Sequence, residues 1–328
     1  MAENTFAELG RIEAIRLLFE NTGYEPFREP LWFSSKGNAV SASATLLEGV
    51  DFNLVYFPLK HLGYKAVLGV VGEMYAVMAQ PEILSVVLGV SAKLDFEQVR
   101  ELWSGIVSAA KEFGVKELSL VLKPSRNGLC INLNASGSDV PEAKRAVAQS
   151  KDLVCVSGSL GAAYLGMQVL ESGMKNFEAG RNTSEEMNRY KMLVGSYLKP
   201  ELQSGIPAQL VQSGITPSFG YFVREGLADA ALRLNRDSGL GVKIYADKIP
   251  FEGGSFEYGK LKDIDPVSAA MNGGDDYKLL FTVPITQLEK FRKDFQSFDI
   301  IGHLALPEVG AVLVTPDGVE LPLSAQGW

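Results

Sequence analysis

The densest group of chemically capable side chains lies near the C-terminus, where Gly273-Gly274-Asp275-Asp276 leads directly into the apolar run 277–283. Glycines let a backbone turn tightly or approach a ligand closely, and adjacent carboxylates repel each other unless water, a cation or a donor separates them. Acidic groups at the mouth of an apolar strand suit ligand binding, which favours a phosphate, metal or substrate site over a solvated turn. Asp275 and Asp276 are therefore the first candidate site residues.

A second acidic pair, Glu48 and Asp51, flanks Gly49 near an expected strand. These carboxylates could contact a cation or an amine, or form an exposed pair on an edge strand. The last residue, Trp328, could fill a groove or stack on a ring-shaped ligand, and the sequence by itself favours the groove. Glu48, Asp51 and Trp328 join the candidates for substrate contact.

The turn Gly158-Ser159-Leu160-Gly161 follows an expected strand and opens an expected helix. Backbone N–H groups at such a turn can bind a phosphate. Because the spacing matches neither a P-loop nor the dinucleotide-binding fingerprint, a tight turn without a ligand is favoured.

Composition and charge narrow the class of function. The 328 residues are 46% hydrophobic and 21% charged, and the formal net charge is -8 with a pI near 5.1. Such a chain is typical of a globular protein without a global positive field for nucleic acid or an anionic membrane. No signal-peptide core or run of membrane-spanning length is evident, so the expected compartment is the cytoplasm.

Cysteine and histidine are scarce. Cys130 and Cys155 lie in apolar strand-like runs and are expected to be buried, reduced thiols. His61 and His303 lie far apart and lack the spacing of a zinc motif, so both are expected to be structural or surface residues.

Periodicity and turn residues predict alternating helices and strands. Helices are expected at residues 7–19, 62–78, 96–113, 162–171, 207–212, 222–236 and 288–295, and strands at 46–57, 83–90, 118–122, 129–133, 153–157, 242–245, 279–283 and 300–304. A turn at Asn127-Gly128 is expected to pair strands 118–122 and 129–133, and Asp317-Gly318 to close a hairpin. The polar stretch 135–150 is the expected boundary between two α/β domains, residues 1–140 and residues 151–328.

Taken in order, a series of short segments resembles the thiamine-monophosphate kinases, a family of the aminoimidazole ribonucleotide (AIR) synthetase-like superfamily. The segments are Glu8-Leu9-Gly10, Leu46-Leu47-Glu48-Gly49-Val50-Asp51-Phe52, Pro58-Leu59-Lys60-His61-Leu62-Gly63-Tyr64-Lys65-Ala66, Tyr75-Ala76, Ala79-Gln80-Pro81, Ser104-Gly105-Ile106, Val156-Ser157-Gly158, Leu160-Gly161-Ala162-Ala163, Leu198-Lys199-Pro200, Ser238 with Gly241, residues 273–281 and Ile301-Gly302-His303. Their shared order over almost the whole chain carries the resemblance.

The resemblance implies a two-domain α/β (α+β) fold and a homodimer formed through the N-terminal domains, which also carry the ATP and Mg²⁺ side. It implies transfer of the γ-phosphate of ATP to thiamine monophosphate, which gives thiamine diphosphate. Because both substrates are anionic, this reaction needs Mg²⁺ ions held by carboxylates from several motifs. It places Glu48, Asp51, Asp275, Asp276 and Trp328 in motifs near the substrate side.

The sequence departs from the family at most of the implied magnesium ligands. Lys36 and Gly37 stand where paired aspartates belong, and Ala44 replaces another aspartate. Glu73 and Glu225 keep a carboxylate, on a longer arm than the octahedral geometry of Mg²⁺ easily tolerates.

Other positions of the implied metal site become apolar, which would reduce the cost of leaving the site dry. These side chains are expected to fill the former metal site as core: Val70, Val121, Leu122 and Phe222.

The leading hypothesis is a thiamine-monophosphate kinase-like protein that has lost Mg-ATP chemistry and acts as a binding or assembly protein. It expects no cofactor and no nucleic-acid or membrane partner. The first alternative is an active kinase that uses ATP and Mg²⁺, with Glu73, Glu225, Asp275 and Asp276 as a reduced metal set.

The second alternative is a metal-free binder of an anionic metabolite, in which Lys36, Arg145 or Arg224 stands in for a lost metal ion. For a binding protein of either kind, with or without relation to thiamine, the expected ligand is a small anionic or thiamine-like molecule.

Overall fold

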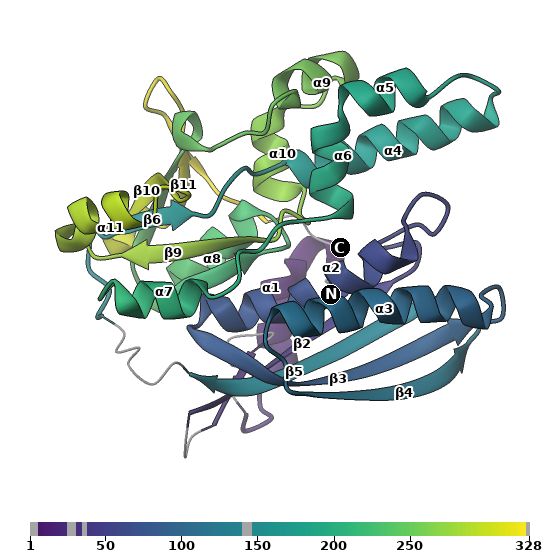
Figure 1. Ribbon diagram of the computed structural model, residues 1–328. Coiled ribbons are helices and arrows are strands. Elements are labelled where there is room, and N and C mark those ends of the chain that lie inside the picture. The colour runs from purple at the N-terminus through teal and green to yellow at the C-terminus, as the bar shows by residue number, and fades with distance from the viewer. Residues whose placement is uncertain (1–5, 25–30, 35–37, 140–145, 326–328) are drawn as a thin grey trace.

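The computed structural model describes residues 6–24, 31–34, 38–139 and 146–325, which form two sheets with helices between and around them (Figure 1). The first sheet has five strands in the order β1-β2-β5-β3-β4. Their bounds are β1 Leu31–Phe33, β2 Ala39–Leu47, β3 Ala79–Ser91, β4 Glu117–Ser125 and β5 Cys130–Asp139. β3 and β4 are parallel, and the other neighbours are antiparallel.

The second sheet has seven strands in the order β12-β11-β8-β10-β6-β9-β7. Their bounds are β6 Leu153–Val156, β7 Gly220–Val223, β8 Gly241–Tyr245, β9 Lys278–Val283, β10 Asp299–Ala305, β11 Ala311–Val314 and β12 Glu320–Pro322. All neighbours are antiparallel except the parallel pair β8 and β11.

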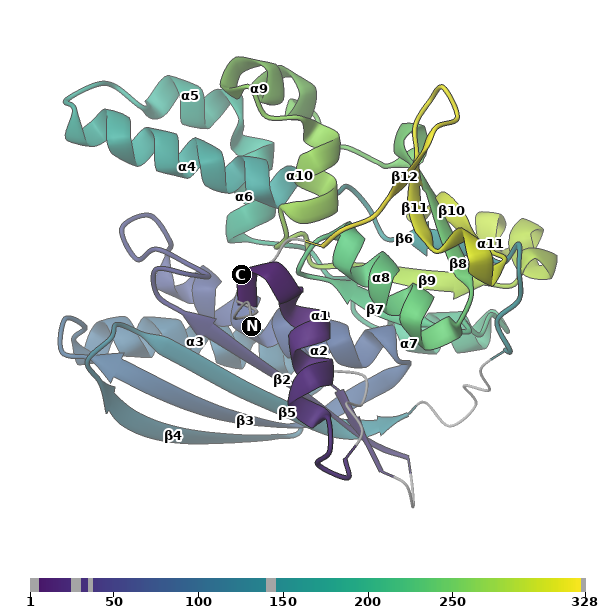
Figure 2. The same ribbon diagram turned by 180° about the vertical axis from the view of Figure 1, so that it is seen from behind.

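The helices form three groups, which Figure 2 shows from behind. The group at the top of Figure 2, to one side of the second sheet, consists of α4 Ala162–Glu178, α5 Ser184–Arg189, α6 Lys191–Leu198, α9 Ser255–Lys262 and α10 Pro266–Asn272. Those beside the second sheet are α7 Ile206–Gln212, α8 Leu227–Ser238 and α11 Leu288–Asp294, and those near the first sheet are α1 Phe6–Phe19, α2 Leu59–Ala76 and α3 Phe96–Glu112. Within the described residues, every helix is too short or too polar to span a bilayer.

α2 is the central helix of the molecule. It packs with α3 on the first sheet and also contacts β7 and β9 of the second sheet. Most of its residues from Leu62 onward are buried, as expected for a helix that is apolar on all sides. The crossing with α3 is close, because a Cβ on Gly105 would lie 1.9 Å from the Lys60 carbonyl oxygen.

The two sheets share one apolar core. Phe222, Leu279 and Phe281 of the second sheet pack in the same cluster as the buried face of the first sheet and α2. β5 extends to Asp139, so the start of the polar stretch 135–150 belongs to the first sheet. The mixed α/β architecture is confirmed, and the division at residues 1–140 and 151–328 stays a prediction.

Three expected elements were wrong in detail. The strand expected over 46–57 ends at Leu47, because Gly49 takes a positive φ of 84° and turns the chain. β4 and β5 do not pair with each other, because β3 lies between them and pairs with both. The helix expected from Phe222 begins only at Leu227, since β7 and the positive φ of Gly226 (102°) precede it.

Candidate functional site

The acidic segment before β9 is fixed against the chain that follows β7. The Asp275 N–H donates to the Arg224 carbonyl oxygen at 2.6 Å, and the Tyr277 N–H donates to that of Val223 at 3.0 Å. Gly274, Asp275 and Tyr277 have positive φ values of 76°, 63° and 56°. This conformation is strained at Asp275 and Tyr277, which are not glycines, and the surrounding hydrogen bonds and packing hold it in place.

Asp275 forms an ion pair with a buried lysine. The Lys65 side chain, from α2, is 1% exposed, and its Nζ lies 3.0 Å from Asp275 Oδ2. The same Nζ donates to the Tyr197 carbonyl oxygen at 2.9 Å and lies 3.9 Å from the centre of the Tyr197 ring. Burial lowers the pKa of Lys65, and the charge of Asp275 opposes that shift. The Asp275 carboxylate is therefore already neutralised by a cation of the protein.

Asp51 has a comparable partner in Arg224. Arg224 Nη2 lies 3.6 Å from Asp51 Oδ1 and donates to the Thr45 carbonyl oxygen at 3.3 Å. Arg224 Nε lies 3.8 Å from Glu225 Oε1. The second oxygen of Asp51 accepts the Leu47 N–H at 2.7 Å. Burial raises the pKa of Asp51, and the Leu47 hydrogen bond and the Arg224 charge oppose that shift.

These two ion pairs border a cavity of about 510 Å³, which we call the Arg224 cavity. Its charged lining consists of Arg11, Asp51, Arg224, Glu225, Asp229 and Asp275. Tyr164 and Met167 of α4 add an aromatic ring and a thioether. The volume lies within the range of small-molecule sites.

Asp276 has different contacts from its neighbour Asp275. Its residue is 3% exposed, and its carboxylate accepts the N–H groups of Gly161 at 2.8 Å and Ala163 at 3.3 Å. Burial raises the pKa of Asp276 to about 7, against the effect of both hydrogen bonds. The turn before α4 thus directs N–H groups at a carboxylate of the protein itself.

The remaining candidates for substrate contact are Glu48 and Trp328. Glu48 Oε2 accepts the Leu129 N–H at 2.6 Å and so supports the turn after β2. Trp328 lies outside the described residues, as do Lys36 and Arg145, and the roles expected for them stay predictions.

The two candidate metal ligands occupy different environments. Glu73, on α2, is 5% exposed, and burial raises its pKa to about 7 against the charges of Arg233 and Arg224. The Glu225 side chain is 48% exposed. Across the described residues, no three or more His, Cys, Asp or Glu side chains gather in a way that could hold a metal ion.

The donor set that is present does not fit a magnesium site. Mg²⁺ requires several oxygen ligands in near-octahedral geometry. Asp51 and Asp275 face Arg224 and Lys65, and Asp276 is committed to backbone N–H groups. Within the described residues, the carboxylates that the kinase alternative would use as metal ligands are therefore not gathered at one site.

An aromatic ring occupies the space beside Gly72. A Cβ on Gly72 would lie 2.2 Å from the buried ring of Phe222. Val70 is also buried, as expected for residues that fill the implied metal site. The same expectation was wrong for Val121 and Leu122, which are 47% and 57% exposed, because β4 is an edge strand that the helices leave uncovered.

Sequence reasoning missed the role of Lys65. Its signal was a lone lysine inside the apolar helical stretch 62–78. A buried lysine requires a partner, and that partner, Asp275, was already a candidate for other reasons.

Comparison with known proteins agrees with the resemblance that the motifs indicate. Residues 31–135 match the family described as AIR synthase related protein, N-terminal domain. The thiamine-monophosphate kinase of Pyrococcus horikoshii is 28% identical over 271 residues, which cover 81% of this chain and 78% of the relative.

Two solved structures share the fold. A structure described as AaThiL complexed with AMPPCP and TMP has a TM-score of 0.78 at 22% identity and covers 98% of this chain and 97% of that one. A HypE-HypF complex has a TM-score of 0.63 at 20% identity, with 88% and 90% covered. At such identities these structures establish the two-domain AIR synthase-like fold alone. The chain therefore carries an AIR synthase-related N-terminal domain and is similar over most of its length to thiamine-monophosphate kinases.

Proposed function

We propose that this chain is a thiamine-monophosphate kinase-like binding protein, which holds a thiamine-like ligand in the Arg224 cavity without transferring phosphate from Mg-ATP. The observation that carries the proposal is the pairing of Asp51 with Arg224 and of Asp275 with Lys65. In both pairs, a cation of the chain lies where a metal ion would otherwise balance the carboxylate.

Electrostatics explains why these pairs oppose magnesium binding. A divalent cation within a few ångströms of Arg224 or Lys65 would be repelled by a charge that the protein cannot move away, since both side chains are largely buried. Phosphoryl transfer between two anionic substrates relies on such cations to neutralise the developing charge. We therefore expect no turnover of ATP and thiamine monophosphate.

The lining of the cavity supports a ligand with a cationic ring and a phosphate. Glu225 and the Tyr164 ring are suited to a positively charged aromatic heterocycle, and Arg11 and Arg224 to a phosphate. Thiamine phosphates combine these two features. The AaThiL relative is described as complexed with TMP, which supports the same ligand class.

Isothermal titration tests the proposal with thiamine, thiamine monophosphate, thiamine diphosphate and AMPPCP, each with and without Mg²⁺. We expect the thiamine compounds to bind with an affinity that Mg²⁺ does not change, and concentrated protein to release no ADP from ATP. Arg224→Met should weaken thiamine monophosphate binding about tenfold, the value of one charged hydrogen bond, while thiamine binding changes less. Arg126→Met, at an exposed arginine of the β4–β5 turn, is the matched control.

Two other outcomes would replace the proposal. Mg-dependent binding of AMPPCP together with formation of thiamine diphosphate would establish the active kinase. Binding of inorganic phosphate without any binding of thiamine would establish a metal-free anion binder.

A further inference from the structure

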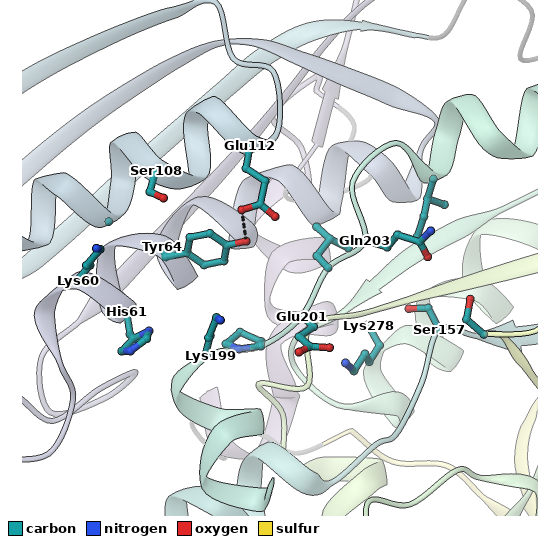
Figure 3. Close-up of a pocket in the computed structure, with 15 residues that line it drawn as sticks. Lys60, His61, Tyr64, Ser108, Glu112, Ser157, Lys199, Glu201, Gln203 and Lys278 are labelled. Carbon is teal, nitrogen blue, oxygen red and sulfur yellow. Dashed lines mark hydrogen bonds between the residues drawn. The ribbon is translucent and has the colours of Figure 1, made fainter. Parts of the chain in front are cut away.

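A second cavity, of about 830 Å³, lies between α2 and α3 on one side and the chain after α6 on the other (Figure 3). It shares no lining residue with the Arg224 cavity. Pro200, Leu202 and Ile206 give it an apolar wall, and its volume is sufficient for a ligand of nucleotide size.

Basic side chains from three separate segments line this cavity. Lys60 and His61 come from the first turn of α2, Lys199 follows α6, and Lys278 begins β9. Figure 3 shows His61, Lys199 and Lys278 around a common space. In a chain with a net charge of -8, such a local cluster marks a place where anions concentrate.

We propose that this cavity is a second ligand site, which binds a small phosphorylated molecule through Lys199 and Lys278 without a metal ion. Both lysines also line an adjoining cavity of about 290 Å³, together with Lys191 and Ser159. They therefore stand where the two cavities meet, and that junction is the position we assign to the phosphate.

Lys278 is the strongest indication of an anion. Its side chain is half-buried, and no acceptor of the described residues lies within hydrogen-bond or ion-pair distance of its Nζ. Burial lowers the pKa of Lys278, while Asp276, Glu201 and Glu252 act on it from a longer range and favour the charged form. A partly desolvated ammonium without a direct partner gains free energy when a phosphate oxygen approaches.

Ser157 and Tyr64 are two of the neutral polar groups that line the cavity. Ser157 Oγ accepts the Leu279 N–H at 2.8 Å, which leaves the hydroxyl proton of Ser157 available for a phosphate oxygen. The Tyr64 hydroxyl donates to Glu112 Oε2 at 2.9 Å, so this carboxylate already has a donor and opposes an anion less than a bare one. Glu201 lines both cavities and is exposed to water, and Glu252 and Asp276 line the adjoining one, so the phosphate must be accommodated beside these carboxylates.

Pyridoxal 5′-phosphate is a suitable probe, because its phosphate can occupy the site while its aldehyde condenses with a lysine amine. The imine forms with loss of one water, and borohydride then reduces the C=N bond to a stable amine that peptide mapping locates. We expect Lys199 or Lys278 to be labelled in preference to two other exposed lysines, Lys116 before β4 and Lys123 in β4. Pyridoxal, which lacks the phosphate, should label these two sites about tenfold less, and pyrophosphate should protect them.

Direct binding of pyrophosphate in the absence of Mg²⁺ provides the second readout. Lys199→Gln and Lys278→Gln should each weaken it about tenfold, whereas Lys123→Gln should leave it unchanged. Lys199 is exposed, so its variant tests the site even if Lys278→Gln unfolds. In Arg224→Met, pyrophosphate should still protect Lys199 and Lys278 from labelling, which separates this site from the Arg224 cavity.

The proposal is overturned if labelling follows surface exposure and pyrophosphate does not protect. It is also overturned if folded Lys199→Gln binds pyrophosphate as the unchanged chain does. Loss of pyrophosphate binding in Arg224→Met alone would assign the anion to the Arg224 cavity instead.

Discussion

Several ionisable side chains of this protein are buried. Lys65 is paired with Asp275, and Asp276 accepts two backbone N–H groups at the start of α4. Glu73 lies on the buried face of α2 near Arg233. Removing one partner of a buried pair leaves an uncompensated charge, so these contacts fix the candidate site in the arrangement that is present.

Asp276 should make the protein less stable as the pH rises from about 5 to about 7. Burial raises its pKa to about 7 in the folded state, whereas an unfolded aspartate titrates near about 3.9. Between these values the folded state binds more protons than the unfolded state, so the free energy of unfolding falls with rising pH. Over that interval the free energy of unfolding of the unchanged chain should fall by about 2 kcal/mol more than that of Asp276→Asn.

Urea denaturation at several pH values within this interval measures that difference. Asp294→Asn, at an exposed aspartate of α11, is the control and should follow the unchanged chain. Glu73 adds a slope of the same sign, because burial also raises its pKa to about 7, so Asp276→Asn should retain part of the dependence. If the free energy of unfolding depends on pH in the same way for Asp276→Asn and the unchanged chain, Asp276 is already ionised at low pH and the prediction is wrong.

At the scale of elements, α2 and β7 meet where the resemblance implies a metal site. α2 presents Gly72 to the ring of Phe222 on β7, and the ring also packs edge-on against Tyr277 with centroids 5.3 Å apart. The strained segment before β9 is thereby tied to both elements. A packed ring cannot coordinate a metal ion, so this contact supports the same proposal as the ion pairs, which is ligand binding without Mg²⁺.

Gly72→Ala should destabilise the chain by about 1–3 kcal/mol, because the added methyl group overlaps the Phe222 ring and the neighbouring core cannot move freely. Gly195→Ala, in α6, is a matched control. A Cβ there meets no atom within 4 Å, and alanine should stabilise the helix by about 0.5–1 kcal/mol. Thermal and chemical unfolding measure both changes.

The double variant Gly72→Ala with Phe222→Leu shows whether the ring is the cause. Leucine is smaller and more adaptable, so it should recover part of the stability lost in Gly72→Ala. If Gly72→Ala is neutral by itself, the contact between α2 and β7 is looser than the structure shows.

At the scale of the whole molecule, α2 and α3 cover one face of the first sheet, while no helix of the described residues covers its other face, which we call the open face (Figure 1). Ile83, Val87 and Val121 are exposed on that open face, at 44%, 38% and 47%. Hydrogen-bonded polar side chains accompany them, including Asn132 with Thr45 at 2.8 Å. We propose that a second copy of the chain covers this face, in agreement with the dimer that the resemblance implies.

The mass of the purified chain by light scattering tests this arrangement. We expect a dimer, and we expect a variant with both Val87→Lys and Val121→Lys to be a folded monomer, because a dimer would bury four unpaired charges. Leu261→Lys, at a leucine of α9 that is 62% exposed, is the control and should leave the dimer intact. A monomeric unchanged chain contradicts the proposal.

The sequence by itself determined those features that depend on neighbours along the chain. Asp95 caps α3 through a reciprocal pair of hydrogen bonds with Gln98, and Asp317-Gly318 closes the hairpin of β11 and β12, as expected from the sequence. Caps and turns are set by local geometry, which is why residue type and spacing are sufficient to find them. The ordered motifs indicated the resemblance to thiamine-monophosphate kinases for the same reason, because each is a short contiguous segment.

Tertiary structure alone decided the contacts between residues that are far apart in the chain. β3 separates β4 from β5, Lys65 meets Asp275 across 210 positions, and Lys278 reaches the same cavity as Lys199. These juxtapositions depend on how sheets and helices pack, and no local pattern encodes which charges will meet. The sequence therefore supplied the carboxylates and the cations of the site, and the fold determined which of them neutralise each other.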